Sequence, residues 1–195
     1  DRQFIRNLLG ATVALDAFND RVHFVTSVTQ EADDPNSPID IVLNDNLRGI
    51  ISESGGNRFK ASISGIQDSG RDSLTLAGKG QYILKDTLLA GRLRSFLVYA
   101  PGDAQARYSA FFSYVSQVPG DSLGYERGIS GGFVLAGVGK GSYLPVQFLP
   151  VPELHRVGNG ILNVMPVSDL TFTAEYALSD HNVNRLSNTP ESSWQ

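Results

Sequence analysis

Hydrophobic and polar residues alternate along several parts of the chain, which is the pattern of half-buried β-strands. In residues 104–115 the even-numbered positions carry Ala, Tyr and Phe, while the odd-numbered positions are mostly polar. Residues 170–179 repeat this alternation, with Leu, Phe, Ala and Tyr at the even positions. Because successive side chains of a strand point to opposite faces, both segments are predicted to be strands with one apolar face.

Three segments share one hairpin design: a strand, a short turn containing Asp, and a second strand. They span residues 9–29, 92–115 and 156–179, and the last two start about 65 residues apart. A second motif, L-A-G followed by G-K-G-x-Y, occurs in residues 76–84 and 135–144, about 60 residues apart. The two spacings predict an internal repeat of about 60–65 residues.

The connections between these strands differ in length. Short turns rich in Pro, Gly, Asn and Asp close the hairpins, whereas the polar segments 30–38, 116–124 and 179–190 join them. A short helix is expected over residues 40–51, capped by Asn44 or Asp45. The sequence therefore predicts an all-β fold of antiparallel up-and-down hairpins, part of an outer-membrane-type barrel or large β-sheet. A soluble β-sandwich is the alternative fold.

Composition narrows the class of protein. The chain of 195 residues has 18% charged residues, 20 glycines, no cysteine and a net charge of −4. It suits one β-rich domain over residues 1–195, or a fragment of a larger protein. Without cysteine there is no disulfide scaffold or thiolate metal site. No basic stripe that would bind nucleic acid is present, and no run of 18 apolar residues occurs.

Two glycine-rich motifs resemble catalytic or phosphate-binding loops. Gly128-Ile129-Ser130-Gly131-Gly132 matches G-x-S-x-G, but the nucleophile elbow needs a helix after the serine, and the residues after Gly132 are typical of a strand. We therefore expect a β-turn here. Residues 137–142 resemble a phosphate loop, but Lys140 is followed by Gly rather than Ser or Thr. Here the glycines are expected to permit a turn or bulge, with Lys140 solvated and Tyr143 packed.

Oxygen-bearing side chains gather in the first long connection. The calcium candidates are Glu31, Asp33, Asp34, Asn36 and Asp40, although the spacing is not that of an EF-hand and a solvated loop is the competing interpretation. Asp180, His181, Asn182 and Asn184 form a similar, weaker cluster. The three histidines lie far apart in the sequence, which disfavours a zinc site. No cofactor is predicted.

Three stretches, residues 8–40, 137–157 and 170–188, together carry a family resemblance. Their G-x-G-x-G-x-Y loop, acidic D-D-P loop and "EYALSD" strand end resemble segments of very large outer-membrane β-barrel proteins of the Bacteroidetes and Chlorobi type, of which the SprA/Sov-like translocon group of type IX secretion is the nearest. The resemblance covers about 75 residues. It implies an outer-membrane location, a role in the envelope or in protein export, no catalytic residues, and a chain that is a fragment of a longer protein.

The sequence therefore favours a non-enzymatic, structural segment of a Gram-negative outer-membrane or cell-surface β-protein. Its partners would be the lipid bilayer, other envelope proteins or further strands of the same larger polypeptide, and not nucleic acid. No leader segment is visible, so a mature product or a piece of a longer chain is expected. The alternative is a secreted β-sandwich module that binds carbohydrate or mediates adhesion, in which the acidic loops would hold calcium. Ester hydrolysis at Ser130 ranks third.

Overall fold

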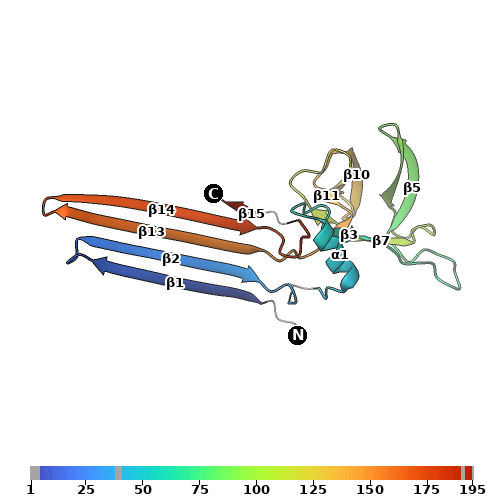
Figure 1. Ribbon diagram of the computed structural model, residues 1–195. Helices are drawn as coiled ribbons and strands as arrows, with labels where there is room; N and C mark the ends of the chain where they lie inside the picture. Colours follow the sequence, from blue (N-terminus) through green and yellow to red (C-terminus); the bar gives the residue numbers. More distant parts are fainter. Residues whose placement is uncertain (1–4, 38–40, 190–191, 195) are drawn as a thin grey trace. The chain divides into compact units, whose positions relative to one another are not determined.

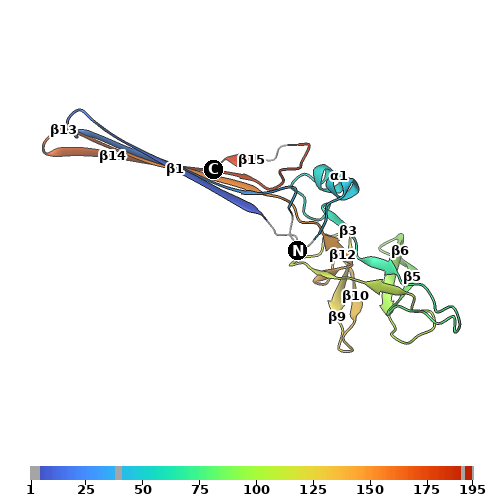
Figure 2. The same cartoon turned by 90° about the horizontal axis from the view of Figure 1, so that it is seen from below.

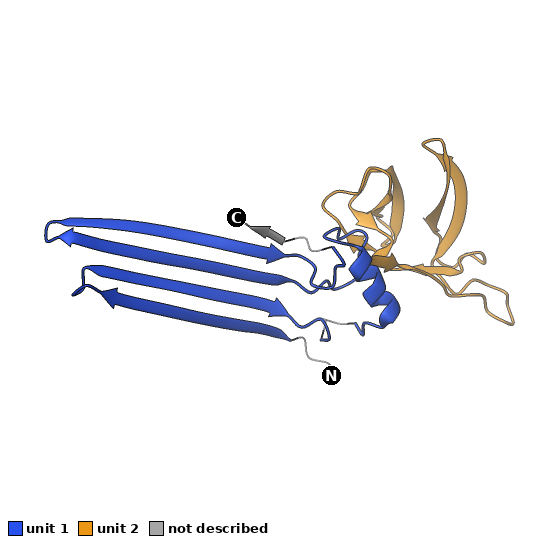
Figure 3. Cartoon of the chain, in the orientation of Figure 1, with its two compact units in different colours: residues 1–61, 149–195 blue, residues 62–148 orange. Residues whose placement is uncertain are grey.

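The computed structural model describes residues 5–37, 41–189 and 192–194, and most of them lie in antiparallel β-strands. The predicted all-β class with up-and-down strands is confirmed. The chain forms two compact units (Figure 3). Unit 1 comprises residues 1–61 and 149–195, and unit 2 comprises residues 62–148. Each unit is described separately below.

Unit 1 contains one sheet with four long strands (Figure 1). Its strands, in spatial order, are β1 (Arg6–Ala17), β2 (Val22–Asp33), β13 (Leu154–Val167), β14 (Leu170–Asn182) and the short β15 (Ser192–Trp194). Every neighbouring pair is antiparallel, and β1 and β2 pair without a register shift from Arg6↔Asp33 to Ala17↔Val22. The outer edge of β1 has no strand partner among the described residues.

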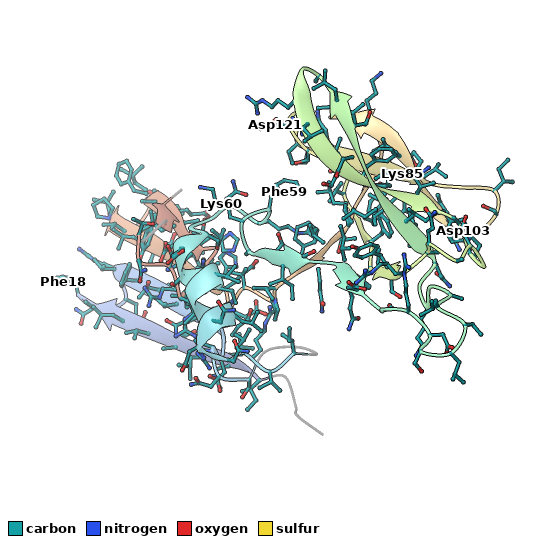
Figure 4. All side chains as sticks on the ribbon, turned by 90° about the vertical axis from the view of Figure 1, so that its right-hand side faces the viewer. Phe18, Phe59, Lys60, Lys85, Asp103 and Asp121 are labelled. Atoms are coloured by element: carbon teal, nitrogen blue, oxygen red, sulfur yellow. The ribbon has the colours of Figure 1, made fainter. Side chains whose placement is uncertain are left out.

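Two of the three predicted hairpins form in this sheet, in residues 9–29 and 156–179. The first turn places Phe18, Asn19 and Asp20 in the left-handed region, with φ of 55°, 55° and 62°. Asn and Asp tolerate this conformation better than most residues, which fits their place in the turn. Phe18 is 78% exposed and lies beyond the ends of the two strands (Figure 4). The second hairpin contains a register shift between Val164 and Val167, where Pro166 lies.

A short helix, α1 (Asp45–Glu53), follows the first hairpin in the chain. Asn44 caps it as predicted, because its side chain accepts a hydrogen bond of 2.9 Å from the Leu47 N–H. The predicted bounds of residues 40–51 are too early: residue 40 lies outside the described residues, residues 41–44 are not helical, and α1 continues to Glu53. Asn184 anchors the other end of the helix: it is buried and donates to the carbonyls of Ile51 and Gly55. None of the described helices has the length and apolar composition needed to cross a membrane.

Unit 2 is built from short strands in three sheets. One sheet has the order β4-β7-β5-β6, another β10-β9-β11-β8, and β12 pairs with β3. The strands are β3 (Ser62–Ser64), β4 (Ile66–Asp68), β5 (Tyr82–Leu89), β6 (Arg92–Tyr99), β7 (Tyr108–Ala110), β8 (Ser113–Tyr114), β9 (Leu123–Arg127), β10 (Phe133–Val138), β11 (Tyr143–Leu144) and β12 (Val146–Phe148).

An aromatic core joins the two larger sheets of unit 2. Tyr82, Leu97 and Tyr125 are buried at its centre, and Phe112 stacks on Phe133 with ring centroids 4.2 Å apart. The Tyr125 hydroxyl accepts a hydrogen bond of 2.9 Å from the Leu97 N–H, which belongs to the other sheet. Burial raises the pKa of the Tyr125 phenol. Unit 2 therefore has a core of its own.

The hairpin predicted over residues 92–115 does not form. The strand β6 pairs with the preceding strand β5 through the two-residue turn Ala90-Gly91, not with residues 104–115. Within that segment only β7 and β8 are strands, and the rest is irregular. The reason is that residues 104–106 bond to the glycine motif instead: Gly78 N–H donates to Ala104 O, and Gly80 N–H donates to Ala106 O.

The expected bulge is present, as a register shift between Leu135 and Gly137, and the glycine motifs are also sites of close backbone approach. A Cβ added to Gly80 would lie 2.3 Å from the Tyr108 carbonyl oxygen, and one added to Gly141 would lie 2.6 Å from the Tyr125 carbonyl oxygen. In both copies of the motif a second strand therefore crosses where only glycine fits. Lys140 is exposed and Tyr143 packs against the aromatic core, as predicted. Whether the two copies reflect a sequence repeat stays a prediction.

Candidate functional site

The long sheet of unit 1 has two chemically different faces. In an antiparallel sheet, paired residues point to the same side, so the register assigns every side chain to a face. One row across the four strands contains Leu15, Phe24, Leu162 and Ala174. The next row, on the opposite face, contains Asp16, His23, Asn163 and Thr173. We call these the apolar face and the polar face; the polar face also carries the exposed apolar residues Leu8, Val157 and Ile161.

The apolar face is uncovered over most of the length of the strands. Figure 2 shows the four long strands as a single layer over this region. Seven of its large side chains are between 46% and 63% exposed, whereas Phe24 and Leu162 on the inner strands are half-buried. The seven are Leu9, Val13, Leu15, Val28, Phe172, Tyr176 and Leu178. The apolar stretch runs through nine positions on β1, residues 9–17, and nine on β14, residues 170–178. A strand needs about 9–11 residues to cross the hydrocarbon core of a bilayer.

A polar residue within the apolar face has its hydrogen bonds satisfied by neighbouring strands. The Thr26 hydroxyl donates to the Asn159 carbonyl at 2.9 Å and lies 2.8 Å from the Tyr176 hydroxyl. The Tyr176 ring reaches Thr26 by lying over Gly160, since a Cβ at Gly160 would be 2.3 Å from the ring. This cross-strand brace of Thr26, Gly160 and Tyr176 shields a hydroxyl that hydrocarbon would not solvate.

Polar residues border the apolar face at both ends. At one end Arg156 donates to the Gln30 side chain at 2.8 Å and lies 3.7 Å from the buried carboxylate of Asp180. We call this the loop end, because the long connections leave the sheet there. At the other end are the two tight turns, residues 18–21 and 168–169, which carry Asn, Asp, Arg and Ser together with the exposed Phe18. An apolar band with polar rims on both sides is the pattern of a strand that crosses a membrane.

The polar face is held together by pairs of side chains from neighbouring strands. Ser27 donates to the Asn159 side chain, and Thr173 donates to Asn163 at 2.7 Å. At the loop end, Arg6 forms ion pairs with Glu31 at 2.8 Å and with Asp33 at 2.6 Å. These contacts join all four long strands on the face opposite the apolar one.

The calcium candidates do not converge on one point. Glu31 and Asp33 both accept from Arg6, Asp34 accepts from the Asn36 N–H, and Asn36 accepts from Arg48. Asp40 lies outside the described residues. In the described ranges, no group of three His, Asp or Glu side chains is placed to hold a metal ion. Calcium binding therefore stays a prediction, while the observed partners of these oxygens are guanidinium and backbone N–H groups.

The fold brings together residues that the sequence separates. His155 and His181 are direct partners on β13 and β14, with ring centroids 5.6 Å apart, although the sequence suggested that the histidines lie apart. His181 Nε2 is 3.3 Å from a carboxylate oxygen of Glu153. These three residues, with Arg6, Glu31 and Asp33, line a shallow hollow of about 260 Å³ at the loop end of the polar face.

Asp180 and Asn184 of the second predicted cluster, and the Ser130 motif, make contacts that hold the local structure. Asp180 is buried beside Arg156, and Asn184 is the helix anchor described above. Ser130 lies in an exposed turn between β9 and β10, which Gly128 and Gly132 close with a hydrogen bond of 2.7 Å. The predicted turn is confirmed, and β10 rather than a helix follows it.

Sequence reasoning identified the apolar face on residues 170–178 but not on β1. The signal was present, because Leu9, Ala11, Val13, Leu15 and Ala17 alternate with more polar residues. The alternation within one strand does not show that the apolar faces of β1 and β14 lie on the same side of the sheet. That alignment depends on the pairing of β2 with β13, which are separated by a long insertion. Comparison with protein-family models, curated proteins and solved structures finds no match for this chain.

Proposed function

We propose that the chain is a structural segment of a Gram-negative outer-membrane or envelope β-protein, in which the long sheet of unit 1 forms part of the wall. The observation that carries this proposal is the uncovered apolar band, nine residues long on β1 and on β14, in which Thr26 is satisfied by the brace. Exposing such an apolar face to water is energetically unfavourable, whereas lipid tails would cover it. The polar face would then meet water.

The unpaired outer edge of β1 supports the proposal that the chain is a segment of a larger β-protein. Long exposed edges without protective residues pair with further strands. Strand β1 carries no Pro, Lys or bulge, and its outer edge is unpaired among the described residues. On the other side, β15 pairs with residues 180–182 only. Further strands of the same larger polypeptide, or other envelope proteins, are the partners that would complete the sheet. The resemblance to outer-membrane translocons supports this location, and a link to protein export rests on it.

The test places a reporter on adjacent residues of β1. The chain has no cysteine, so Val13→Cys on the apolar face and Thr12→Cys on the polar face each introduce a single labelling site. In native envelope vesicles, a fluorescent label at position 13 should be quenched by a quencher attached to lipid tails. The label at position 12 should be quenched by a water-soluble quencher. Equal aqueous quenching at both positions would contradict a lipid-facing band.

A secreted binding module is the second candidate, and unit 2 is the observation that favours it. Its two larger sheets share one aromatic core, as in a sandwich. A chain that acts wholly as such a module should be monodisperse without detergent and should bind glycans. Loss of that binding on adding a chelator would indicate a calcium requirement. Aggregation without detergent, with recovery in it, would favour the membrane segment instead.

A further inference from the structure

The long sheet has long chain connections at one end and short turns at the other. The short turns are residues 18–21 and 168–169. The loop end carries the connection 34–153 between β2 and β13, and the residues that follow β14. In bacterial outer-membrane barrels the short turns face the periplasm and the long loops face the exterior. The asymmetry therefore assigns a direction to the sheet.

Unit 2 lies entirely within the long connection 34–153. The chain leaves the sheet at Asp33 and enters it again at Leu154, and these residues are at the loop end of neighbouring strands. A folded unit with an aromatic core cannot cross the bilayer between those two points without further spanning strands. If the sheet spans a membrane as proposed, both ends of unit 2 therefore join strands on the same side of that membrane.

We propose that unit 2, residues 62–148, is displayed on the outer surface of the cell, and that the two tight turns of unit 1 face the periplasm. This inference rests on the proposed function. It assigns unit 2 as the part of the chain that meets extracellular partners, while the turns at residues 18–21 and 168–169 meet periplasmic ones. The rim that contains Arg156 and Gln30 lies at the outer leaflet.

Cysteine labelling of intact cells tests the direction, with the cysteine-free chain as background. Ser130→Cys in unit 2 and Ser168→Cys in the second tight turn both replace exposed serines. A membrane-impermeant maleimide should label Ser130→Cys in intact cells, and Ser168→Cys only after the outer membrane is permeabilised. A second pair, Ser73→Cys in unit 2 and Arg21→Cys in the first turn, replaces any variant that fails to accumulate, and labelling after denaturation reports the total amount.

The outcomes separate the two proposals. Labelling of the turn variants in intact cells, with the unit 2 variants protected until permeabilisation, would overturn the direction and leave a spanning sheet. Labelling of both positions in intact cells, or protection of both, would show that the sheet does not separate two compartments. That result would overturn the proposed function as well. Only the expected asymmetry supports surface display.

Discussion

At the scale of single residues, the brace around Thr26 shows how a polar group is accommodated on an apolar face. Tyr176 covers Gly160, and its hydroxyl meets the Thr26 hydroxyl two strands away. Glycine at position 160 is required by this contact, not by backbone conformation. Gly158 lies on the same face two residues earlier, and a Cβ there would meet only Ser27 O and Val28 Cγ2, each at 3.9 Å. Gly158 can therefore serve as the control position for a substitution at Gly160.

We expect Gly160→Ala to destabilise the sheet by about 1–3 kcal/mol, because its Cβ would displace the Tyr176 ring and leave Thr26 uncovered. Gly158→Ala should change the free energy of unfolding by less than about 0.5 kcal/mol. Urea unfolding in lipid vesicles, followed by circular dichroism, measures both. Equal midpoints for the two variants would mean that the brace does not contribute to stability.

At the scale of elements, alternation predicted strands well where the partner is close in sequence. Residues 170–179 form a strand as predicted, since the tight turn next to them brings β13 into register. Residues 104–115 show the same alternation, but the backbones of residues 104–106 bond to Gly78 and Gly80, so only β7 and β8 form. Alternation describes side chains, and it cannot tell which backbone provides the partner. The turn Ala90-Gly91, which sets the pairing of β5 with β6, was the missed signal.

The site was less predictable than the fold for the same reason. The carboxylates near Asp33 were predicted to be metal ligands, because the sequence does not show that their partners come from distant segments of the chain. Arg6 precedes them by a whole hairpin, and Glu153 follows Asp33 across the insertion, where its N–H donates to the Asp33 carboxylate at 3.1 Å. Pairing between distant strands decides whether a group of acidic residues binds a cation or a guanidinium group.

We expect unit 2 to become less stable at alkaline pH, because Tyr125 is buried between its two larger sheets. Burial raises the pKa of Tyr125 above the value of about 10 that it has when unfolded. As pH rises, Tyr125 therefore loses its proton first in the unfolded state. Its contribution to the free energy of unfolding is fully present below pH about 10 and is lost as pH rises toward the raised pKa of the folded state. Near-ultraviolet circular dichroism should show the aromatic core loosening above pH about 10.

Two variants locate the origin of this alkaline transition. Tyr125→Phe removes the ionising group and should weaken the dependence of stability on pH, although it lowers stability at neutral pH by about 1–3 kcal/mol because the buried Leu97 N–H loses its acceptor. Tyr114→Phe alters a residue that is 64% exposed and should leave the transition unchanged. If both variants kept the full pH dependence, Tyr125 would not be its source.

At the scale of the whole molecule, unit 2 is an insertion whose two ends lie side by side. Ser62 and Phe148 are paired residues of β3 and β12, and just outside them the Leu149 N–H donates to Ala61 O at 2.9 Å. The chain therefore enters and leaves unit 2 at one point. Each unit also has its own strand pairing, so neither needs the other to complete a sheet.

Replacing residues 62–148 by the turn sequence Asn-Gly should leave the sheet of unit 1 intact, because Ala61 and Leu149 are already at hydrogen-bond distance. The shortened chain should keep the β-sheet circular dichroism signal and the quenching difference between positions 12 and 13. An Asn-Gly insertion after Ser130 in the full chain controls for the added turn. Loss of the sheet signal in the shortened chain alone would show that unit 1 depends on unit 2.

The pairing of the long strands in two hairpins determines how a sheet of this kind can be widened. Strand β1 starts, and strand β14 finishes, at the same rim of the sheet, because the long strands come as two up-and-down pairs. A pair of this kind can be added to a wider sheet, or taken out of it, without moving any other connection to the opposite end of the strands. The width of the sheet can therefore change while every remaining connection keeps its place.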